Sequence, residues 1–392
     1  MPLSAFLQRI AGSKAAARPL ALARIGATAA MLLELPNTGA TLLRLADPSV
    51  IHAPYLPWVP RLTEPIAWLL IGLWLVAGLM FLVGWRARLA GAVLTATLAS
   101  VLFVDQQTYS NHLYLMLLVA GLLTVGDSGA AISLDARRAG ERESVPGWPV
   151  FLLCAQVCIV YGYAALAKLN PDFLSGSVVA SYVRSEGPLG LPQAWRTFEP
   201  MFVLSLMAIA SEAYLALSLW SPRRRPAAMV VGLGLHAFIT GWLSPFMSLL
   251  VFSLLMLPLY LPFLDVAPRS RVVVWDDGCG FCAEWVKWFR RLDWMHGLRF
   301  VPRSELASAG LPVDEDAAAR ALQFVLPSGR VRGGFAAVTR VLELLPLTFL
   351  WAPLLRLPPV AAVGERVYRR VAISRRCELP LPRVSAVESP RA

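Results

Sequence analysis

The sequence predicts an α-helical polytopic membrane bundle of about eight transmembrane helices, followed by a small α/β domain. Hydrophobic residues make up 57% of the chain and charged residues only 16%, whereas soluble domains carry about 25% charged residues. The mean hydropathy is +0.59. The shortage of charge lies before residue 265, so a membrane domain precedes a more polar one.

Apolar runs of the length of a membrane span divide the first part of the chain. A spanning helix needs about 20 apolar residues. The first run follows a basic lead-in (residues 1–20) and is interrupted by Glu34, and we expect it to be an uncleaved first span. The other expected spans are Pro65–Gly84, Leu89–Val104, His112–Val125, Trp148–Leu169, Met201–Trp220, Ala227–Trp242 and Phe246–Leu264. The bundle is thus expected over residues 21–265.

The distribution of arginine and lysine predicts the orientation of the bundle. With the N-terminus inside, the lead-in and the inner connections carry twelve basic residues and the outer connections four, as the positive-inside rule requires. We therefore expect a bacterial-type inner membrane protein with its N-terminus and C-terminal domain in the cytoplasm. The net charge of +11 follows from these loops and does not indicate a nucleic-acid partner. The longest outer connection, residues 170–199, is either plain surface or a cap over the bundle.

Ionisable side chains from four expected spans lie between about the midplane and the outer face of the bundle. Lys168, at the end of the fifth span, either snorkels to the headgroups or is a functional group within the membrane. The topology places Lys168 and the Asn111–His112 pair near the outer face, Glu212 near the midplane and His236 slightly outward of it. Exposing these groups to lipid separately is costly, so we expect them to line one internal polar site.

Three motifs of the predicted bundle resemble the HTTM family, the membrane domain related to vitamin K-dependent γ-carboxylase. They are SNHLYLMLL (Ser110–Leu118), YAALAKLNPDFLSGSVV (Tyr163–Val179) and GLGLHAFITGWLSPF (Gly232–Phe246). The resemblance covers about residues 21–264. It implies that Lys168 is the base that takes a proton from a reduced, vitamin K-like quinone, that His112 belongs to the same active site, and that His236 matches a further family histidine.

The chain departs from the carboxylase in one large respect. The carboxylase has a sizeable lumenal domain that binds the recognition peptide of its substrate, and no outer connection here is long enough for one. The resemblance therefore implies binding or oxygenation of a quinol rather than carboxylation of peptide glutamate. The chemistry needs a dry site, because desolvation disfavours the lysine ammonium and a neutral amine can act as a base on a phenolic hydroxyl.

A C-x-x-C motif opens the polar domain. RVVVW (Arg271–Trp275) predicts a strand, and DDGCGFC then leads into an amphipathic helix. This order is thioredoxin-like: the helix N-terminus stabilises the thiolate of Cys279, the expected nucleophile, and Cys282 resolves the mixed disulfide. The alternatives are structural cysteines or half of a zinc site, for which His296 and Cys377 would have to supply the other ligands.

The rest of this domain is predicted to be strands followed by amphipathic helices. Leu298–Ser304 and Leu322–Gly334 predict strands, the latter pair joined by a turn at Pro327–Gly329. Charged residues and four prolines interrupt the apolar stretch Phe335–Val363, so amphipathic helices are expected there. Residues 378–392 carry no motif, and their Pro, Ser and Arg content predicts a disordered tail.

Residues 270–377 resemble the DCC family of thiol-disulfide oxidoreductases. The matching motifs are WDDGCGFC, GRVRGGFAAV and VYRRVAISRR. The family motif begins Tyr-Asp-Gly-x-Cys-x-x-Cys; here Trp275 replaces the tyrosine and Asp276 is kept. The resemblance implies a thioredoxin-like fold and a protein thiol or thioredoxin-like partner.

Three functions are compatible with this organisation. The first is a membrane enzyme that acts on a quinol or another lipid-soluble substrate and carries a thiol module. The second is a non-catalytic anchor, or a quinone- or lipid-binding module, that tethers a redox domain. The third is a transporter that uses Glu212 and His236 as a proton relay, which the lack of an internal repeat disfavours. The topology puts Lys168 outside and Cys279 inside, so the two domains act on separate substrates unless a quinone carries electrons between the faces.

Overall fold

The chain folds into two compact units, residues 1–267 and 268–392. A computed structural model describes residues 8–183, 198–242, 247–264 and 271–374. The first unit is helical, and the second contains a mixed sheet with helices on both faces.

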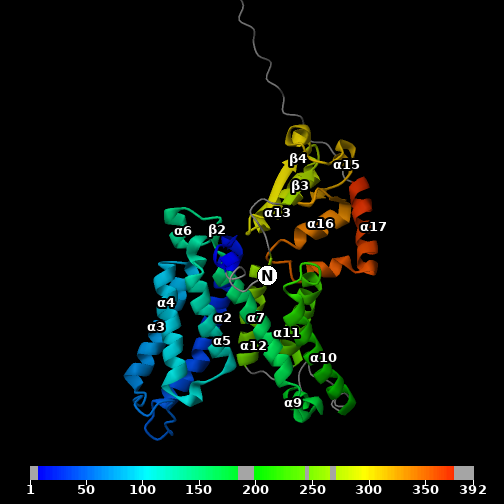
Figure 1. Ribbon diagram of the computed structural model, residues 1–392. Helices are drawn as coiled ribbons and strands as arrows, with labels where there is room; N and C mark the ends of the chain where they lie inside the picture. Colours follow the sequence, from blue (N-terminus) through cyan, green and yellow to red (C-terminus); the bar gives the residue numbers. More distant parts are fainter. Residues whose placement is uncertain (1–7, 184–197, 243–246, 265–270, 375–392) are drawn as a thin grey trace, which may run out of the picture. The chain divides into compact units, whose positions relative to one another are not determined.

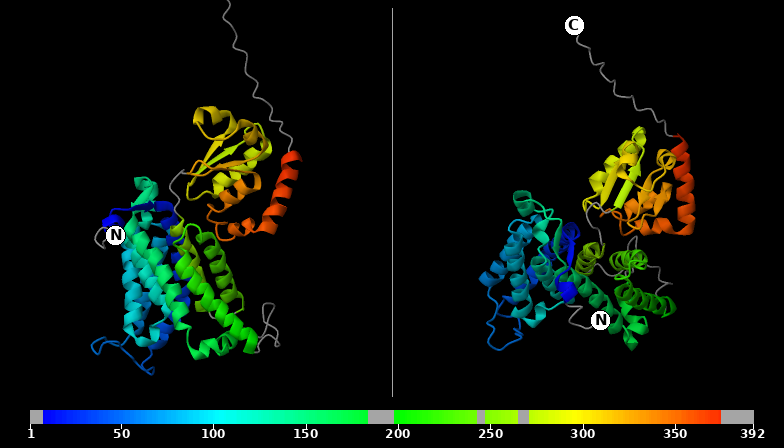
Figure 2. Two further views of the ribbon diagram at one scale, coloured as in Figure 1. Left: turned by 45° about the vertical axis from the view of Figure 1, so that its right-hand side comes forward. Right: turned by 45° about the horizontal axis from the view of Figure 1, so that its top comes forward.

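The helices of the first unit lie side by side (Figure 1; Figure 2 shows two further views). Each range in which the sequence predicts a span is occupied by a helix, and the first helix begins at Ala17, before the expected start at residue 21. The long helices are α2 (Ala17–Leu45), α3 (Glu64–Val83), α4 (Ala87–Val104), α5 (Asn111–Val125), α7 (Gly147–Ala167), α10 (Phe198–Ser218), α11 (Arg225–Trp242) and α12 (Met247–Met256), which η4 (Leu257–Phe263) continues.

The apolar character of these helices confirms a multi-pass membrane protein. Five of the described helices, α2, α3, α4, α7 and α10, are long and apolar enough to cross a membrane. The stretches Asn111–Val125 and Leu249–Phe263 are shorter apolar helices. The predicted count of about eight spans is therefore not confirmed, because α5 and α12 are short and α11 is not among these five helices.

Helix α2 packs against α3, α5, α12 and η4. Its buried face carries small side chains such as Ala23, Ala27 and Ala30, which allow neighbouring helices to approach closely. A side chain at Gly26 would overlap Pro258 of η4. Close packing of small residues thus places this helix in contact with both early and late elements of the unit.

One end of the bundle gathers arginine residues and is called the basic end here. The short strand β1 (Lys14–Ala16) pairs antiparallel with β2 (Ser144–Pro146), and Arg18 forms an ion pair with Glu141. Helix α6 (Leu134–Ala139) and the turn η2 (Ser128–Ala130) lie in the same connection. The lead-in and the connection between α5 and α7, both predicted to lie on one membrane face, therefore meet.

The connections at the far end of α4 are held by Asp105. Its carboxylate accepts hydrogen bonds from the backbone N–H of Ala53 (3.0 Å) and Gln107 (2.9 Å), and lies 3.1 Å from Nδ1 of His52. Burial opposes ionisation, but these hydrogen bonds outweigh it and lower the pKa of Asp105. Two short helices, α8 (Pro171–Leu174) and α9 (Ser177–Tyr182), follow α7, and much of the outer connection 170–199 lies outside the described residues.

The second unit is built on a four-stranded sheet in the order β4-β3-β5-β6. Strand β3 (Arg271–Trp275) is parallel to β4 (Leu298–Pro302) and antiparallel to β5 (Gln323–Val325), which pairs antiparallel with β6 (Val331–Gly333). The turn between β5 and β6 contains Gly329 at φ 78°, a conformation that favours glycine. The strands thus form where the sequence predicts them.

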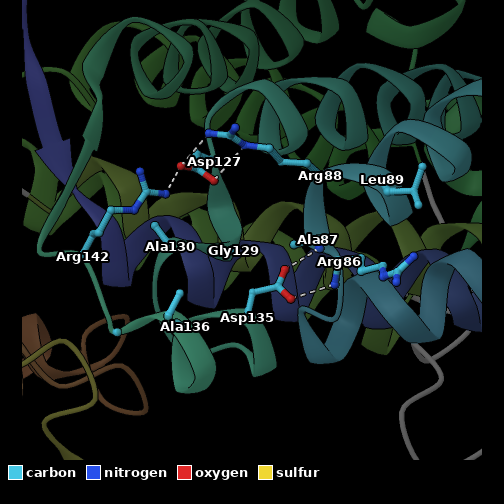
Figure 3. A pocket seen from close by; sticks show the side chains of 12 residues that line it. Arg86, Ala87, Arg88, Leu89, Asp127, Gly129, Ala130, Asp135, Ala136 and Arg142 are labelled. Carbon is cyan, nitrogen blue, oxygen red and sulfur yellow. Dashed lines mark hydrogen bonds and ion pairs between the residues drawn. The ribbon is translucent and has the colours of Figure 1, made fainter.

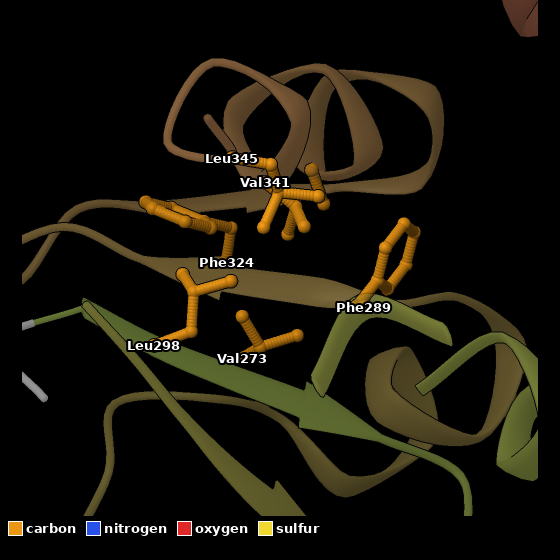
Figure 4. Close-up of a cluster of buried hydrophobic side chains, with 7 residues drawn as sticks. Val273, Phe289, Leu298, Phe324, Val341 and Leu345 are labelled. Atoms are coloured by element: carbon orange, nitrogen blue, oxygen red, sulfur yellow. The ribbon is translucent and has the colours of Figure 1, made fainter. Parts of the chain in front are cut away.

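Alternate residues of the central strands face two separate cores. On one face, Val273 and Phe324 pack with Phe289 of α13 (Gly280–Leu292) and Val341 of α16 (Gly334–Leu342), as Figure 4 shows. On the other face, Val274 packs with residues of α14 (Leu306–Ala309) and α15 (Glu315–Arg320). This arrangement fixes the start of α13 directly after the end of β3.

The apolar stretch Phe335–Val363 forms α16, the turn η6 (Ala352–Arg356) and the start of α17 (Pro358–Ser374). Helix α17 contacts α16 and η6, and the hydroxyl of Tyr368 accepts a hydrogen bond from the backbone N–H of Leu322 (3.0 Å). The stretch is helical, as predicted. Cys377 and the predicted tail lie outside the described residues.

Candidate functional site

Lys168 and Glu212 form an ion pair between two helices of the bundle. Lys168 ends α7, and its Nζ donates a hydrogen bond of 2.8 Å to Oε1 of Glu212 on α10. The lysine side chain is 26% exposed and the glutamate side chain 9%. Nζ also lies 5.6 Å from the centre of the Phe173 ring on α8, close enough for a cation–π interaction. Lys168 therefore faces a buried carboxylate rather than the lipid headgroups.

His236 belongs to a second polar group, buried between α7, α11, α12 and η4. Its Nε2 lies 2.7 Å from the hydroxyl of Tyr161, and its Nδ1 lies 3.0 Å from the hydroxyl of Ser253. The Tyr161 hydroxyl also lies 2.6 Å from that of Tyr260. Gly232 makes room for this contact, because a side chain at that position would overlap the Tyr260 hydroxyl.

His112 belongs to a third group, with Glu34. Its Nε2 lies 3.3 Å from Oε1 of Glu34, whose side chain is 1% exposed. The same carboxylate oxygen accepts hydrogen bonds from the Asn37 amide (2.7 Å) and the Thr38 hydroxyl (3.0 Å). Asn111 is exposed.

The structure thus joins Lys168 to Glu212 and places the two histidines elsewhere. No hydrogen bond or ion pair among the described residues connects the three groups directly. The first two groups share one face of α7, because Tyr161 precedes Lys168 by seven residues, which is two helical turns or about 10 Å.

The sequence did not predict the partners of the two histidines. Glu34 was visible only as an interruption of the first apolar run. Tyr161 and Tyr260 are aromatic residues in apolar segments, where a packing role is the default expectation. The seven-residue spacing of Tyr161 and Lys168 was the available signal for a shared face.

Cys279 and Cys282 occupy the first turn of α13 in the second unit. Cys279 is the N-cap residue of α13, and it is fully buried, whereas Cys282 is partly exposed. The N-terminus of a helix carries partial positive charge, which stabilises a thiolate. Cys279 thus lies at the N-terminus of α13, and Cys282 lies within its first turn.

Two aspartates shape the turn that precedes the cysteines. Asp276 is buried; its carboxylate accepts a hydrogen bond from the Gly278 N–H (3.3 Å) and pairs with Nε of Arg303 (3.2 Å). Asp277 accepts a hydrogen bond from the backbone N–H of Ser304 (3.2 Å). Burial opposes ionisation of Asp277, but hydrogen bonds from Ser304 outweigh it and lower the pKa of the carboxyl group. Both carboxylates thus tie this turn to the segment that follows β4.

Aromatic side chains are exposed on α13, the helix that begins after Cys279. Phe281, Trp285 and Trp288 follow one another at helical spacing and are 46%, 50% and 50% exposed.

No group of three or more His, Cys, Asp or Glu side chains within the described ranges could hold a metal ion.

The Lys168–Glu212 pair is expected to contribute to stability. Replacing Lys168 by Met leaves a buried carboxylate without its cation and should lower the free energy of unfolding by about 3 kcal/mol. The double change Lys168→Met with Glu212→Gln should recover most of this loss, because no charge is then left unpaired. Thermal unfolding of the four forms in detergent gives the coupling energy, and additive effects of the two changes would contradict the pairing.

Comparison with known protein families agrees with both resemblances. The HTTM domain model matches residues 13–266, and the DCC1-like thiol-disulfide oxidoreductase model matches residues 273–377. No solved structure matches the chain. Since the first match spans more than half of the sequence, the chain belongs to the HTTM family and carries a DCC1-like thiol-disulfide oxidoreductase domain at its C-terminal end.

Proposed function

We propose that this protein is a membrane-bound thiol-disulfide oxidoreductase that acts through Cys279 and Cys282. The observation that carries the proposal is the placement of the two thiols at the N-cap and in the first turn of α13, directly after the central strand β3. The helical unit holds this module at the membrane. If the two cysteines served only to fill space in the core, they would not need to lie at a helix N-terminus.

The exchange reaction needs only the two thiols and a protein disulfide. The Cys279 thiolate attacks one sulfur of the substrate disulfide, and the other substrate sulfur leaves as a thiolate. The Cys282 thiolate then attacks Sγ of Cys279, which releases the second substrate thiolate and leaves a Cys279–Cys282 disulfide. Two electrons pass to the substrate, and a dithiol protein restores the reduced pair.

Burial of Cys279 favours a polypeptide partner over a small disulfide. The thiol has no exposed surface, so a substrate must displace covering side chains before it can react. The exposed rings of Phe281 and Trp285 offer an apolar surface on which a polypeptide can bind beside the cysteines.

The helical unit supports a second chemistry at Lys168 on a quinol or another lipid-soluble substrate. The 2.8 Å hydrogen bond to Glu212 gives Lys168 a route to its neutral form: its proton moves to the carboxylate, and Nζ then accepts the proton of a quinol hydroxyl. The products are a quinolate beside the Lys168 ammonium and a neutral Glu212. The pair therefore serves as one proton acceptor, and both members are needed.

Replacing Cys282 by Ser should trap a mixed disulfide between Cys279 and the substrate protein, because the resolving thiol is missing. The adduct is detected in membranes by non-reducing electrophoresis and identified by mass spectrometry. Cys279→Ser should form no adduct. Cys158→Ser, which removes a thiol of α7, is the matched control and should behave as the unaltered chain does. Adducts that persist in Cys279→Ser would exclude Cys279 as the nucleophile.

Lys168→Met and Glu212→Gln should each slow the oxidation of menaquinol or ubiquinol by dissolved oxygen, catalysed by purified protein, about 100-fold or more, as expected for loss of the base that forms the oxygen-reactive quinolate. Lys14→Met removes an exposed lysine of the same unit and should leave turnover unchanged. Quinol binding by tryptophan fluorescence separates loss of binding from loss of chemistry. If all three variants turn over quinol as fast as the unaltered protein, Lys168 and Glu212 are not catalytic. The helical unit would then be an anchor or a quinone- or lipid-binding module.

A further inference from the structure

A charged pocket of about 400 Å³ lies at the basic end of the helical unit. Its walls come from the turn between α3 and α4, the first turn of α4, and the connection from η2 through α6. Three arginines and two aspartates give it its polarity: Arg86, Arg88, Arg142, Asp127 and Asp135. Figure 3 shows their side chains around the pocket.

The two carboxylates of the pocket are already engaged by groups of the chain. Asp127 accepts hydrogen bonds from both Arg88 (3.0 Å to Nη2) and Arg142. Asp135 accepts hydrogen bonds from the backbone N–H groups of Arg86 (2.9 Å) and Ala87 (2.7 Å) at the start of α4. The side chain of Arg86 forms no ion pair with any described residue. The pocket therefore carries an excess of positive charge.

A further arginine lies behind the wall of the pocket. The guanidinium of Arg24 is fully buried, and Nη2 donates a hydrogen bond of 2.7 Å to the carbonyl of Ile132. Within the described residues, its Nε and Nη1 have no hydrogen-bond partner, although the guanidinium is attracted electrostatically by Asp135. Gly84, at φ 69°, leaves the space for it, because a side chain there would overlap Nη1 of Arg24 as well as Ser133. A buried cation of this kind is costly and adds to the attraction for an anion.

The backbone around the pocket is held in an unusual conformation. In the described part of the helical unit, the non-glycine residues with positive φ are Arg86 (45°), Asp127 (58°) and Ile132 (44°). Two of them line the pocket, and the third accepts the hydrogen bond from Arg24. Such residues persist where the surrounding contacts hold them, and they concentrate at functional sites.

The position of the pocket along the chain corresponds to the membrane surface. It lies where α3 ends at Val83 and α4 begins at Ala87, and both helices are candidate spans. Trp85, between them, is 41% exposed, and tryptophan is enriched at membrane–water interfaces. Leu89 lines the pocket and is 54% exposed. A headgroup bound among the arginines would therefore lie next to an apolar surface for its acyl chains.

We infer that this pocket binds the phosphate group of an anionic phospholipid headgroup. Arginine matches phosphate oxygens with paired hydrogen bonds, and basic residues beside membrane spans attract anionic lipids. The lipid bridges the α3–α4 turn and the α6 connection, which close the basic end of the bundle.

Native mass spectrometry of the full-length protein in detergent, titrated with phosphatidylglycerol or phosphatidylcholine, tests the inference. Phosphatidylglycerol should bind about tenfold more tightly than phosphatidylcholine. The double change Arg86→Gln with Arg88→Gln should remove this preference. Arg86→Gln alone breaks no ion pair and should weaken phosphatidylglycerol binding severalfold. This single variant therefore tests the inference even if the double variant does not fold.

The matched control is Arg137→Gln with Arg138→Gln, which removes two exposed charges of α6 that do not line the pocket. Binding should change by less than about twofold in this control. An equal loss in the control, or equal affinity for both lipids, would overturn the inference. If inorganic phosphate stabilises the protein and phosphatidylglycerol does not bind, and if this stabilisation is lost in Arg86→Gln, the pocket binds a soluble phosphate. That result would exclude the lipid headgroup.

Discussion

The cost of placing a charge in an apolar interior organises the helical unit of this protein. An unpaired ion in such surroundings is costly, and the two carboxylates inside the bundle each contact a cation or a potential cation: Glu212 contacts Lys168, and Glu34 contacts His112. Each pair joins helices that are far apart in the sequence. Pairing therefore fixes which helices are neighbours, in addition to hydrophobic packing, which has little directional preference.

Each unit of the chain carries one candidate site. In the bundle, Lys168 donates a hydrogen bond of 2.8 Å to the buried carboxylate of Glu212. In the C-terminal unit, Cys279 lies at the N-terminus of α13, and Asp276 and Asp277 hold the turn that precedes it. The protein thus combines a buried ion pair in its helical unit with a pair of cysteines at a helix N-terminus. The two sites need not share a substrate.

Much of the fold could be predicted from the sequence, because long apolar runs and a strand–turn–helix pattern are local signals. The predicted strands, the helix that starts after Cys279 and the membrane helices form where expected. The number of spans could not be fixed, because α5 and α12 are shorter than a bilayer requires. The sequence places Lys168 near the outer face and Glu212 near the midplane, and it does not predict that the two side chains form an ion pair.

The partners of the histidines could not be predicted, because depth does not determine which faces of helices meet. His112 contacts Glu34, and His236 contacts Tyr161. Both contacts depend on packing between segments separated by more than 70 residues. A tyrosine within an apolar span also gives no sign of whether its hydroxyl is buried against a polar partner.

An equilibrium redox titration of the full-length protein tests the central claim, that Cys279 and Cys282 form a working dithiol. The protein is equilibrated in glutathione buffers of increasing potential, and its disulfides are identified by mass spectrometry of alkylated peptides. The account predicts a single two-electron transition in which Cys279 and Cys282 form the disulfide, while Cys154 and Cys158 stay reduced throughout. Absence of a Cys279–Cys282 disulfide at every potential would contradict it.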